Sequence, residues 1–229
     1  MAFKTVLRTL SFPIIFSFAF PFAVHAEPAK QAEQSKLKVN ITPSIGRFTV
    51  MHNGQPVTVM RNQDAANKII DDYALTSRSC PPFCIQPFQL LPGVTTIGEL
   101  EMIQFLKQKA AGDKNLLIID SRTPDWVAKG TIPSATNIPW TQLHRESSSY
   151  EPLVIEEILT DRFGAKNEDG IWNFAQAKQL VLFCNGPWCG QSPTNLIALV
   201  NMGYPAHKLF WYRGGMQSWN SLGLTTVKP

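Results

Sequence analysis

The second half of the chain contains short apolar runs separated by stretches with the composition of helices. Runs of strand formers without polar alternation are typical of parallel strands that are covered on both faces. The stretch IGELEMIQFLKQKAAG at 97–112 predicts one of the covering helices. From residue 93 onward the pattern therefore predicts an α/β fold, a parallel sheet with helices on both faces. The strand signals are LLIID at 116–120, TNIPW at 136–140, QLVLFC at 179–184 and KLFWY at 208–212.

The N-terminus predicts an export signal. Lys4 and Arg8 precede an uncharged apolar stretch at 9–24, and the Val-x-Ala sequence ending at Ala26 suits a signal peptidase. The apolar stretch is shorter than the ~20 residues that a membrane-spanning helix needs. We therefore expect cleavage after Ala26 and a periplasmic or secreted mature protein without stable membrane insertion.

The charge of the mature chain gives no support for nucleic-acid binding. Residues 1–26 contain two of the 21 basic residues and none of the 17 acidic ones, so their removal leaves a formal net charge of +2. A nearly neutral chain without a clustered basic stripe does not indicate nucleic-acid binding.

Residues 27–92 form an N-terminal extension or small module, and residues 93–229 form the main domain. In the extension, RFTVMHNGQPVTVMR alternates apolar and polar residues around Asn53-Gly54 and predicts a small hairpin. We expect Asp64 to cap a short helix after it.

A cysteine stands at the end of one predicted strand, in VLFCNGPWCGQSPTNLIALV at 181–200. Turn formers follow Cys184, and Ser192 is the expected N-cap of the next helix, which we expect to end near Gly203. The free N–H groups and the macrodipole at a helix start stabilise a thiolate. Cys184 is therefore a candidate nucleophile, and a buried or disulfide-bonded cysteine is the alternative.

Three separated motifs occur in one order along residues 93–229: LLIIDSRTPDWVAKGTIPSATNIPW, VLFCNGPWCGQS and KLFWYRGGMQSWNSLGLTTVKP. Together they resemble the rhodanese superfamily of sulfurtransferases. The resemblance implies a rhodanese-like domain in which Cys184 takes sulfur as a persulfide from a small sulfur-containing anion such as thiosulfate. A thiol or cyanide acceptor then removes the sulfur, with no cofactor and no metal.

The resemblance also implies that N–H groups of the loop hold the donor's oxyanions and the persulfide. Family loops often carry Arg or Lys, and this loop carries neither, which also argues against phosphatase activity. Arg213 is our candidate for the missing cation, and a structural arginine is the alternative. Arg122 is expected to pair with a carboxylate. The substrate-binding residues predicted beside Arg213 are Asn185, Gly186, Trp188, Gly190 and Gln191.

Cys189 follows Cys184 closely on the same loop, and three interpretations remain open. Cys189 resolves the persulfide by forming a disulfide, or the pair works as a thiol–disulfide redox centre, or the pair is a structural disulfide. The alternatives for the whole protein are thus a redox protein with a periplasmic redox partner, and a non-catalytic module that binds an anion or a protein.

Cys80 and Cys84 bracket a Pro-Pro-Phe segment and predict a local disulfide. A sharper hypothesis is that the loop SCPPFCIQPF folds over the catalytic loop as a lid or redox partner. The spacing of the four cysteines departs from that of common zinc sites.

Overall fold

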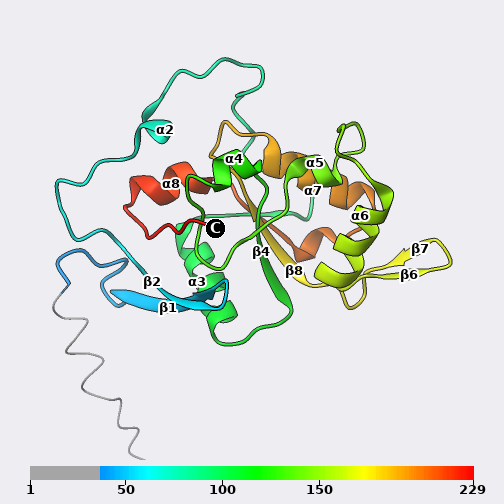
Figure 1. Cartoon of the computed structure of the whole chain (residues 1–229), viewed down its shortest axis with the longest axis horizontal. Helices are drawn as coiled ribbons and strands as arrows, with labels where there is room; N and C mark the ends of the chain where they lie inside the picture. The colour runs from blue at the N-terminus through cyan, green and yellow to red at the C-terminus, as the bar shows by residue number, and fades with distance from the viewer. Residues whose placement is uncertain (1–36) are drawn as a thin grey trace, which may run out of the picture.

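A computed structural model describes residues 37–229, so the predicted export signal lies outside the described residues. Its centre is a five-stranded sheet in the order β3-β9-β8-β4-β5, in which every pairing is parallel (Figure 1). This confirms the predicted rhodanese-like α/β fold. The strands are β3 (Thr95–Ile97), β4 (Leu116–Asp120), β5 (Thr136–Asn137), β8 (Gln179–Phe183) and β9 (Leu209–Tyr212).

The central strands are apolar at 116–119 and 180–183 because both faces of the sheet are buried there. Side chains alternate between the faces of a strand. In β8, Leu180 and Leu182 therefore pack into one hydrophobic cluster, and Val181 and Phe183 pack into the other. All four are fully buried.

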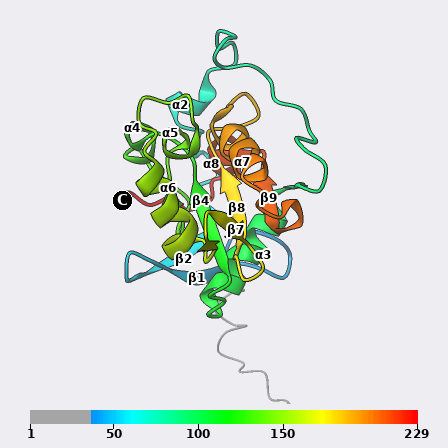
Figure 2. The same ribbon diagram turned by 90° about the vertical axis from the view of Figure 1, so that its right-hand side faces the viewer.

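Helices cover the two faces (Figure 2). The face of Leu182 is covered by α5 (Trp140–Leu143), α6 (Pro152–Glu157) and α7 (Gln191–Asn201). The face of Phe183 is covered by α3 (Glu99–Ala110) and α8 (Gly215–Ser221). Within residues 37–229, no helix combines the length and hydrophobicity that crossing a membrane requires.

The predicted N-terminal hairpin is present as β1 (Arg47–His52) and β2 (Gln55–Met60), which turn at Asn53-Gly54. Val50 and Val59 are buried in the same cluster as α3 and α8. The hairpin is thus packed onto the main domain and shares its core. The remaining elements are α2 (Asp71–Ala74), α4 (Pro124–Val127), η1 (Ile158–Arg162), β6 (Lys166–Glu168), β7 (Ile171–Asn173) and η2 (Ala206–Lys208).

The short helix expected over residues 65–75 is present only as α2, and the cap predicted at Asp64 is wrong, because Ile70 is the N-cap. The Asp64 carboxylate accepts a hydrogen bond from the N–H of Ala66, and the N–H of Asp64 bonds to the side chain of Asn62. Such local bonds give the backbone an alternative to the helix. Helical structure begins only at α2, which is four residues long.

Candidate active site

Three central strands end level with one another, and this edge carries the candidate nucleophile. Asp120 of β4 pairs with Phe183 of β8, which pairs with Tyr212 of β9. Cys184 and Arg213 follow directly, so the register brings their backbones together at the carboxyl edge of the sheet. Ligands of open parallel sheets bind outside this edge.

The start of α8 holds the beginning of the cysteine loop, which runs over residues 184–190. The N–H of Met216 donates to the carbonyl of Cys184 (3.0 Å), and the N–H of Gln217 donates to that of Asn185 (2.8 Å). Gly215 has a positive φ of 54°, and a Cβ at this position would overlap the Cys184 carbonyl oxygen. Only glycine allows the two backbones to approach so closely.

Cys184 is 2% exposed, and its sulfur lies beside the first turn of α7. The Ser192 hydroxyl lies 3.1 Å from it, and the indole nitrogen of Trp211 lies 3.1 Å from the same hydroxyl oxygen. An indole nitrogen can only donate. The serine oxygen therefore accepts from Trp211, which leaves the serine hydrogen for the sulfur. When protonated, Cys184 donates to the carbonyl of Cys189 (3.3 Å).

The surroundings favour the thiolate of Cys184. Burial by itself raises the pKa of this thiol, because an apolar site disfavours charge. Hydrogen bonds from the Cys189 thiol, from the hydroxyl and backbone of Ser192 and from the backbone of Gly186 outweigh burial, so the pKa lies below its ordinary value.

Ser192 was expected to cap α7, and this is wrong. The helix begins at Gln191 with Gly190 as its N-cap. Ser192 lies inside the first turn, and its fully buried hydroxyl faces the sulfur instead. Sequence reasoning missed this role, although a serine in the first turn after a strand-end cysteine was the available signal.

Cys189 is also a free, buried thiol, 4% exposed, and the two loop cysteines are not joined. Its sulfur also lies 3.8 Å from the amide oxygen of Gln191. Burial and the neighbouring Cys184 raise the pKa of Cys189 well above its ordinary value. Cys189 is thus the proton donor of the pair.

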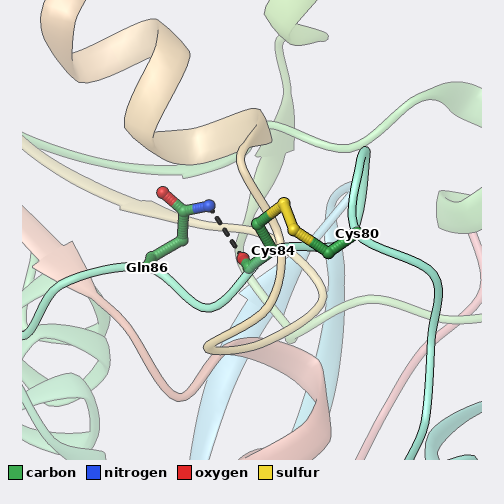
Figure 3. Close-up of a disulfide and its surroundings, with 3 residues drawn as sticks. All are labelled: Cys80, Cys84 and Gln86. Atoms are coloured by element: carbon green, nitrogen blue, oxygen red, sulfur yellow. Dashed lines mark hydrogen bonds between the residues drawn. A yellow bond between two sulfur atoms is a disulfide. The ribbon is translucent and has the colours of Figure 1, made fainter.

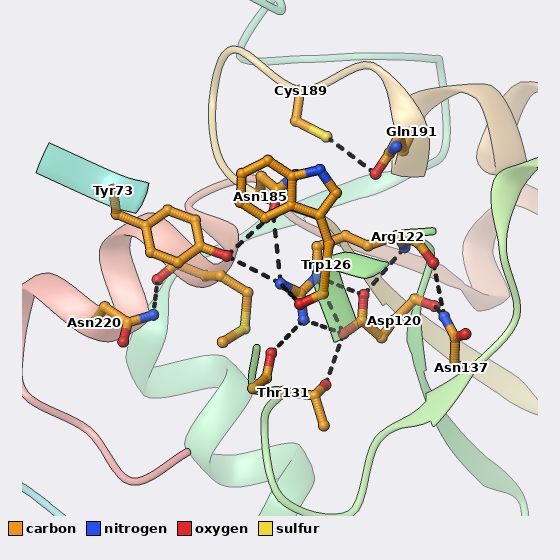
Figure 4. Close-up of polar contacts among 12 residues, drawn as sticks. Tyr73, Asp120, Arg122, Trp126, Thr131, Asn137, Asn185, Cys189, Gln191 and Asn220 are labelled. Atoms are coloured by element: carbon orange, nitrogen blue, oxygen red, sulfur yellow. Dashed lines mark hydrogen bonds and ion pairs between the residues drawn. The ribbon is translucent and has the colours of Figure 1, made fainter. Parts of the chain in front are cut away.

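Arg122 lies behind the loop at the centre of a buried polar network (Figure 4). Its guanidinium binds the Asp120 carboxylate at 2.6 and 2.9 Å and the Tyr73 hydroxyl at 2.9 Å, and Tyr73 in turn donates to Asn185 (3.1 Å). The Thr131 hydroxyl also donates a hydrogen bond to the Asp120 carboxylate (2.7 Å). The expected pairing of Arg122 with a carboxylate is confirmed. Burial lowers the pKa of Arg122, but Asp120 outweighs burial and holds it above its usual value.

The other predicted substrate-binding residues lie in the cysteine loop, at the start of α7 and at the end of β9. Gly186, Gly190 and Gln191 belong to the loop and the start of α7, while Trp188 donates from its indole to Gln217 (2.6 Å). Arg213 donates to the carbonyls of Gln86 and Pro87 at 2.8 and 3.1 Å. The structure thus gives Arg213 a role in holding residues 86–87. Its role in binding an anion stays a prediction.

Cys80 and Cys84 form the predicted local disulfide (Figure 3). The loop that contains it lies against the cysteine loop, since the N–H of Gln86 donates to the carbonyl of Pro187 (2.8 Å). Among residues 37–229, no three His, Cys, Asp or Glu side chains gather in a way that could hold a metal ion.

Comparison with known proteins gives similar solved structures and a family. A rhodanese with anions from E. coli is 21% identical, with a TM-score of 0.32 over 50% of this chain and 99% of that one. The As-Sb reductase from Leishmania major is 18% identical (TM-score 0.38; 55% and 76% covered). The polysulfide-sulfur transferase homodimer from Wolinella succinogenes is 18% identical (TM-score 0.39; 61% and 82% covered).

No curated protein matches the sequence significantly. The sequence model of the Rhodanese-like domain matches residues 103–222, which is more than half of the chain and includes the cysteine loop. The chain therefore belongs to the rhodanese-like domain family.

Proposed function

We propose that the protein is a sulfurtransferase that carries sulfane sulfur as a persulfide on Cys184. The observation that supports this most directly is the environment of the Cys184 sulfur. This atom is buried at the start of α7, yet the hydroxyl and N–H groups around it lower its pKa. A buried thiol without such donors would stay protonated and unreactive.

In the first step, the Cys184 thiolate attacks the outer sulfur of a donor such as thiosulfate. A bond forms between the two sulfurs, the sulfur–sulfur bond of thiosulfate breaks, and sulfite leaves with the electron pair. In the second step, an acceptor nucleophile attacks the outer sulfur of the persulfide, and Cys184 leaves as a thiolate. Both steps are displacements at sulfur, so no external oxidant is needed, and ping-pong kinetics are expected.

Neutral groups of the cysteine loop stabilise negative charge on the donor and on the persulfide. The resemblance to the family implies that backbone N–H groups of the loop hold the donor anion and the persulfide. The loop of this protein has no cationic side chain of its own. The buried Arg122 cation lies behind Asn185 and interacts with the charge of Cys184. Groups that are already oriented stabilise developing charge without the cost of reorienting solvent.

The thiol–disulfide alternative rests on the proximity of Cys184 and Cys189. A dithiol reductase needs both sulfurs as nucleophiles or leaving groups in turn. The raised pKa of Cys189 keeps it protonated at neutral pH, which favours a proton-donating role beside the Cys184 persulfide. A periplasmic redox protein would be a partner only under this alternative.

We also propose that the mature protein works in the periplasm or is secreted. The export pattern at residues 1–26 and the Cys80–Cys84 disulfide support this location, because disulfides persist in oxidising compartments. Fractionation of the source cells, with N-terminal sequencing of the mature chain, would test it. A cytosolic protein with an intact N-terminus would overturn it.

The experiment for the proposed function weighs the intact protein after incubation with thiosulfate. We expect the mass of one added sulfur atom, its loss when cyanide is added, and no adduct on the Cys184→Ser variant. Disulfide reductase activity that needs both loop cysteines, with no sulfur adduct, would establish the redox alternative. The absence of both behaviours would leave a binding module.

A further inference from the structure

The cover loop, residues 78–88, lies across the cysteine loop and is attached to it at several points. The backbone of Gln86 bonds to that of Pro187, and the ring of Phe83 meets the ring of Trp188 edge to face, with centroids 5.5 Å apart. Arg213, at the end of β9, holds the carbonyls of Gln86 and Pro87. The cover loop is thus fixed at the carboxyl edge of the sheet.

The disulfide sets the shape of the cover loop near Phe83. Cys80 and Cys84 have their Cα atoms 4.6 Å apart and close a small ring that contains Pro81, Pro82 and Phe83 (Figure 3). The amide of Gln86 donates to the carbonyl of Cys84 (2.9 Å) and continues the structure toward the cysteine loop. A closed ring with two prolines leaves Phe83 little conformational freedom.

Between the cover loop and the cysteine loop lies a pocket of about 430 Å³. Its walls are mainly apolar, and the cysteine loop and the start of α7 contribute Asn185, Cys189, Gly190 and Gln191. None of the nine residues of the described chain that line it carries a charge. The walls are formed by Pro82, Phe83, Trp126 and Trp140.

One of the lining residues has a hydrogen-bond donor without a partner. The indole nitrogen of Trp140 is buried, and among the described residues it has no hydrogen-bond acceptor. A buried donor left unpaired costs free energy.

On the basis of the proposed function, we propose that this pocket binds the sulfur acceptor, and that the acceptor is an uncharged organic thiol with an aromatic or apolar body. Such a body gains from contact with the rings of Phe83, Trp126 and Trp140. A small anion placed there would lose its hydration and meet no charged side chain in the lining, since the nearby Arg78 guanidinium lies over the Phe83 and Trp126 rings and is not one of the lining residues. Cys189 lines the pocket, so an acceptor bound there lies beside the cysteine loop.

The reaction needs no further reagent. The thiol sulfur of the bound acceptor, as it loses its proton, attacks the outer sulfur of the Cys184 persulfide and forms a new sulfur–sulfur bond. The bond between that sulfur and Cys184 breaks, and its electron pair returns to Cys184, which becomes a thiolate again. The product is the persulfide of the acceptor, and the proton of the acceptor thiol passes to solvent.

The experiment begins with protein loaded with one sulfur on Cys184 and follows removal of that sulfur in a single turnover. Phenylmethanethiol is compared with 2-sulfanylethanesulfonate, an anionic thiol of comparable acidity, and with cyanide. We expect the rate of sulfur removal to reach a plateau with rising phenylmethanethiol concentration. We also expect phenylmethanethiol to remove the sulfur at least about tenfold more efficiently than the anionic thiol. If Cys184 takes up no sulfur from thiosulfate, the proposed function is overturned. If Cys184 takes up sulfur but both thiols remove it equally fast, with rates that rise linearly with thiol concentration, only the acceptor pocket is overturned.

Two variants locate the effect in the pocket. Phe83→Ala should lower the efficiency toward phenylmethanethiol about tenfold, and loading by thiosulfate and removal by cyanide should stay unchanged. The matched control is Phe88→Ala, because Phe88 is on the same loop but 73% exposed and outside the pocket. Trp140→Phe keeps an aromatic wall and removes the unpaired donor, so it should retain the preference for phenylmethanethiol. Equal behaviour of the Phe83 and Phe88 variants would overturn the proposal.

Discussion

Replacement of Ser192 by alanine tests the environment of Cys184. The serine hydroxyl is fully buried, 3.1 Å from the sulfur, and its oxygen is occupied by the Trp211 indole. Its hydrogen is therefore committed to the sulfur and stabilises the thiolate. A hydrogen bond to a charged group contributes about 1.5–3 kcal/mol. Its loss should raise the pKa of Cys184 and lower the thiolate fraction at a given acidic pH by about ten- to a hundredfold.

The change in reaction rate is smaller than the change in thiolate fraction. A thiolate of higher pKa is a better nucleophile, with a Brønsted coefficient of about 0.4–0.5. Alkylation of Ser192→Ala by iodoacetamide should therefore slow by about three- to tenfold at pH values where the thiolate is the minor form. At high pH, where the thiolate is complete, the rate should equal or exceed that of the unchanged protein. A merely structural defect would lower both limbs of the profile.

The assay measures alkylation of Cys184 against pH, with the thiolate absorbance as a second readout and Cys184→Ser as the blank. Ser192→Ala also leaves the buried Trp211 donor unpaired, which costs about 1–3 kcal/mol of stability. The double variant Ser192→Ala/Trp211→Phe removes that donor and should show the same shifted profile with stability partly restored. If the plot of alkylation rate against pH has its inflection at the same pH in both variants as in the unchanged protein, Ser192 does not stabilise the thiolate.

Three further substitutions test other parts of the site. Cys189→Ser should still take up one sulfur from thiosulfate, and loss of the mass adduct would mean that Cys189 is needed for loading. Gly215→Ala should lower the free energy of unfolding in urea by at least about 1–3 kcal/mol, because φ is positive and the methyl group would overlap the Cys184 carbonyl; full stability would contradict this geometry. Arg122→Met should cost about 3–5 kcal/mol in the same assay, since it leaves the Asp120 carboxylate buried and unpaired, and a cost below about 1 kcal/mol would show that water reaches Asp120.

Local pattern was enough to predict the architecture. Apolar runs without alternation, such as 179–184, are required wherever a strand is buried on both faces, so they predicted the central parallel strands. Asn53-Gly54 predicted the hairpin because few residue pairs adopt the positive φ values found there. The edge strand β3 escaped prediction, since three residues of Thr-Thr-Ile carry too little pattern and pair only through β9.

The position of Cys184 at a strand end was likewise local information, but its partners were not. Ser192 reaches the sulfur only because α7 starts at Gln191 and β9 brings Trp211 beside it. Tyr73 meets Arg122 across 49 positions of sequence. No pattern within a window of sequence specifies contacts that depend on how separate elements pack.

Arg213 shows most clearly what tertiary structure decided. The sequence placed it beside the active-site strand, and the register of β8 and β9 agrees. Its hydrogen bonds nevertheless go to the cover loop, more than a hundred residues earlier in the chain. By itself the sequence determined the sheet, the hairpin and the place of the reactive cysteine, because periodicity and turn chemistry act between near neighbours. Folding alone decided which donors face the sulfur and which rings enclose the pocket, because those contacts join segments that only packing brings together.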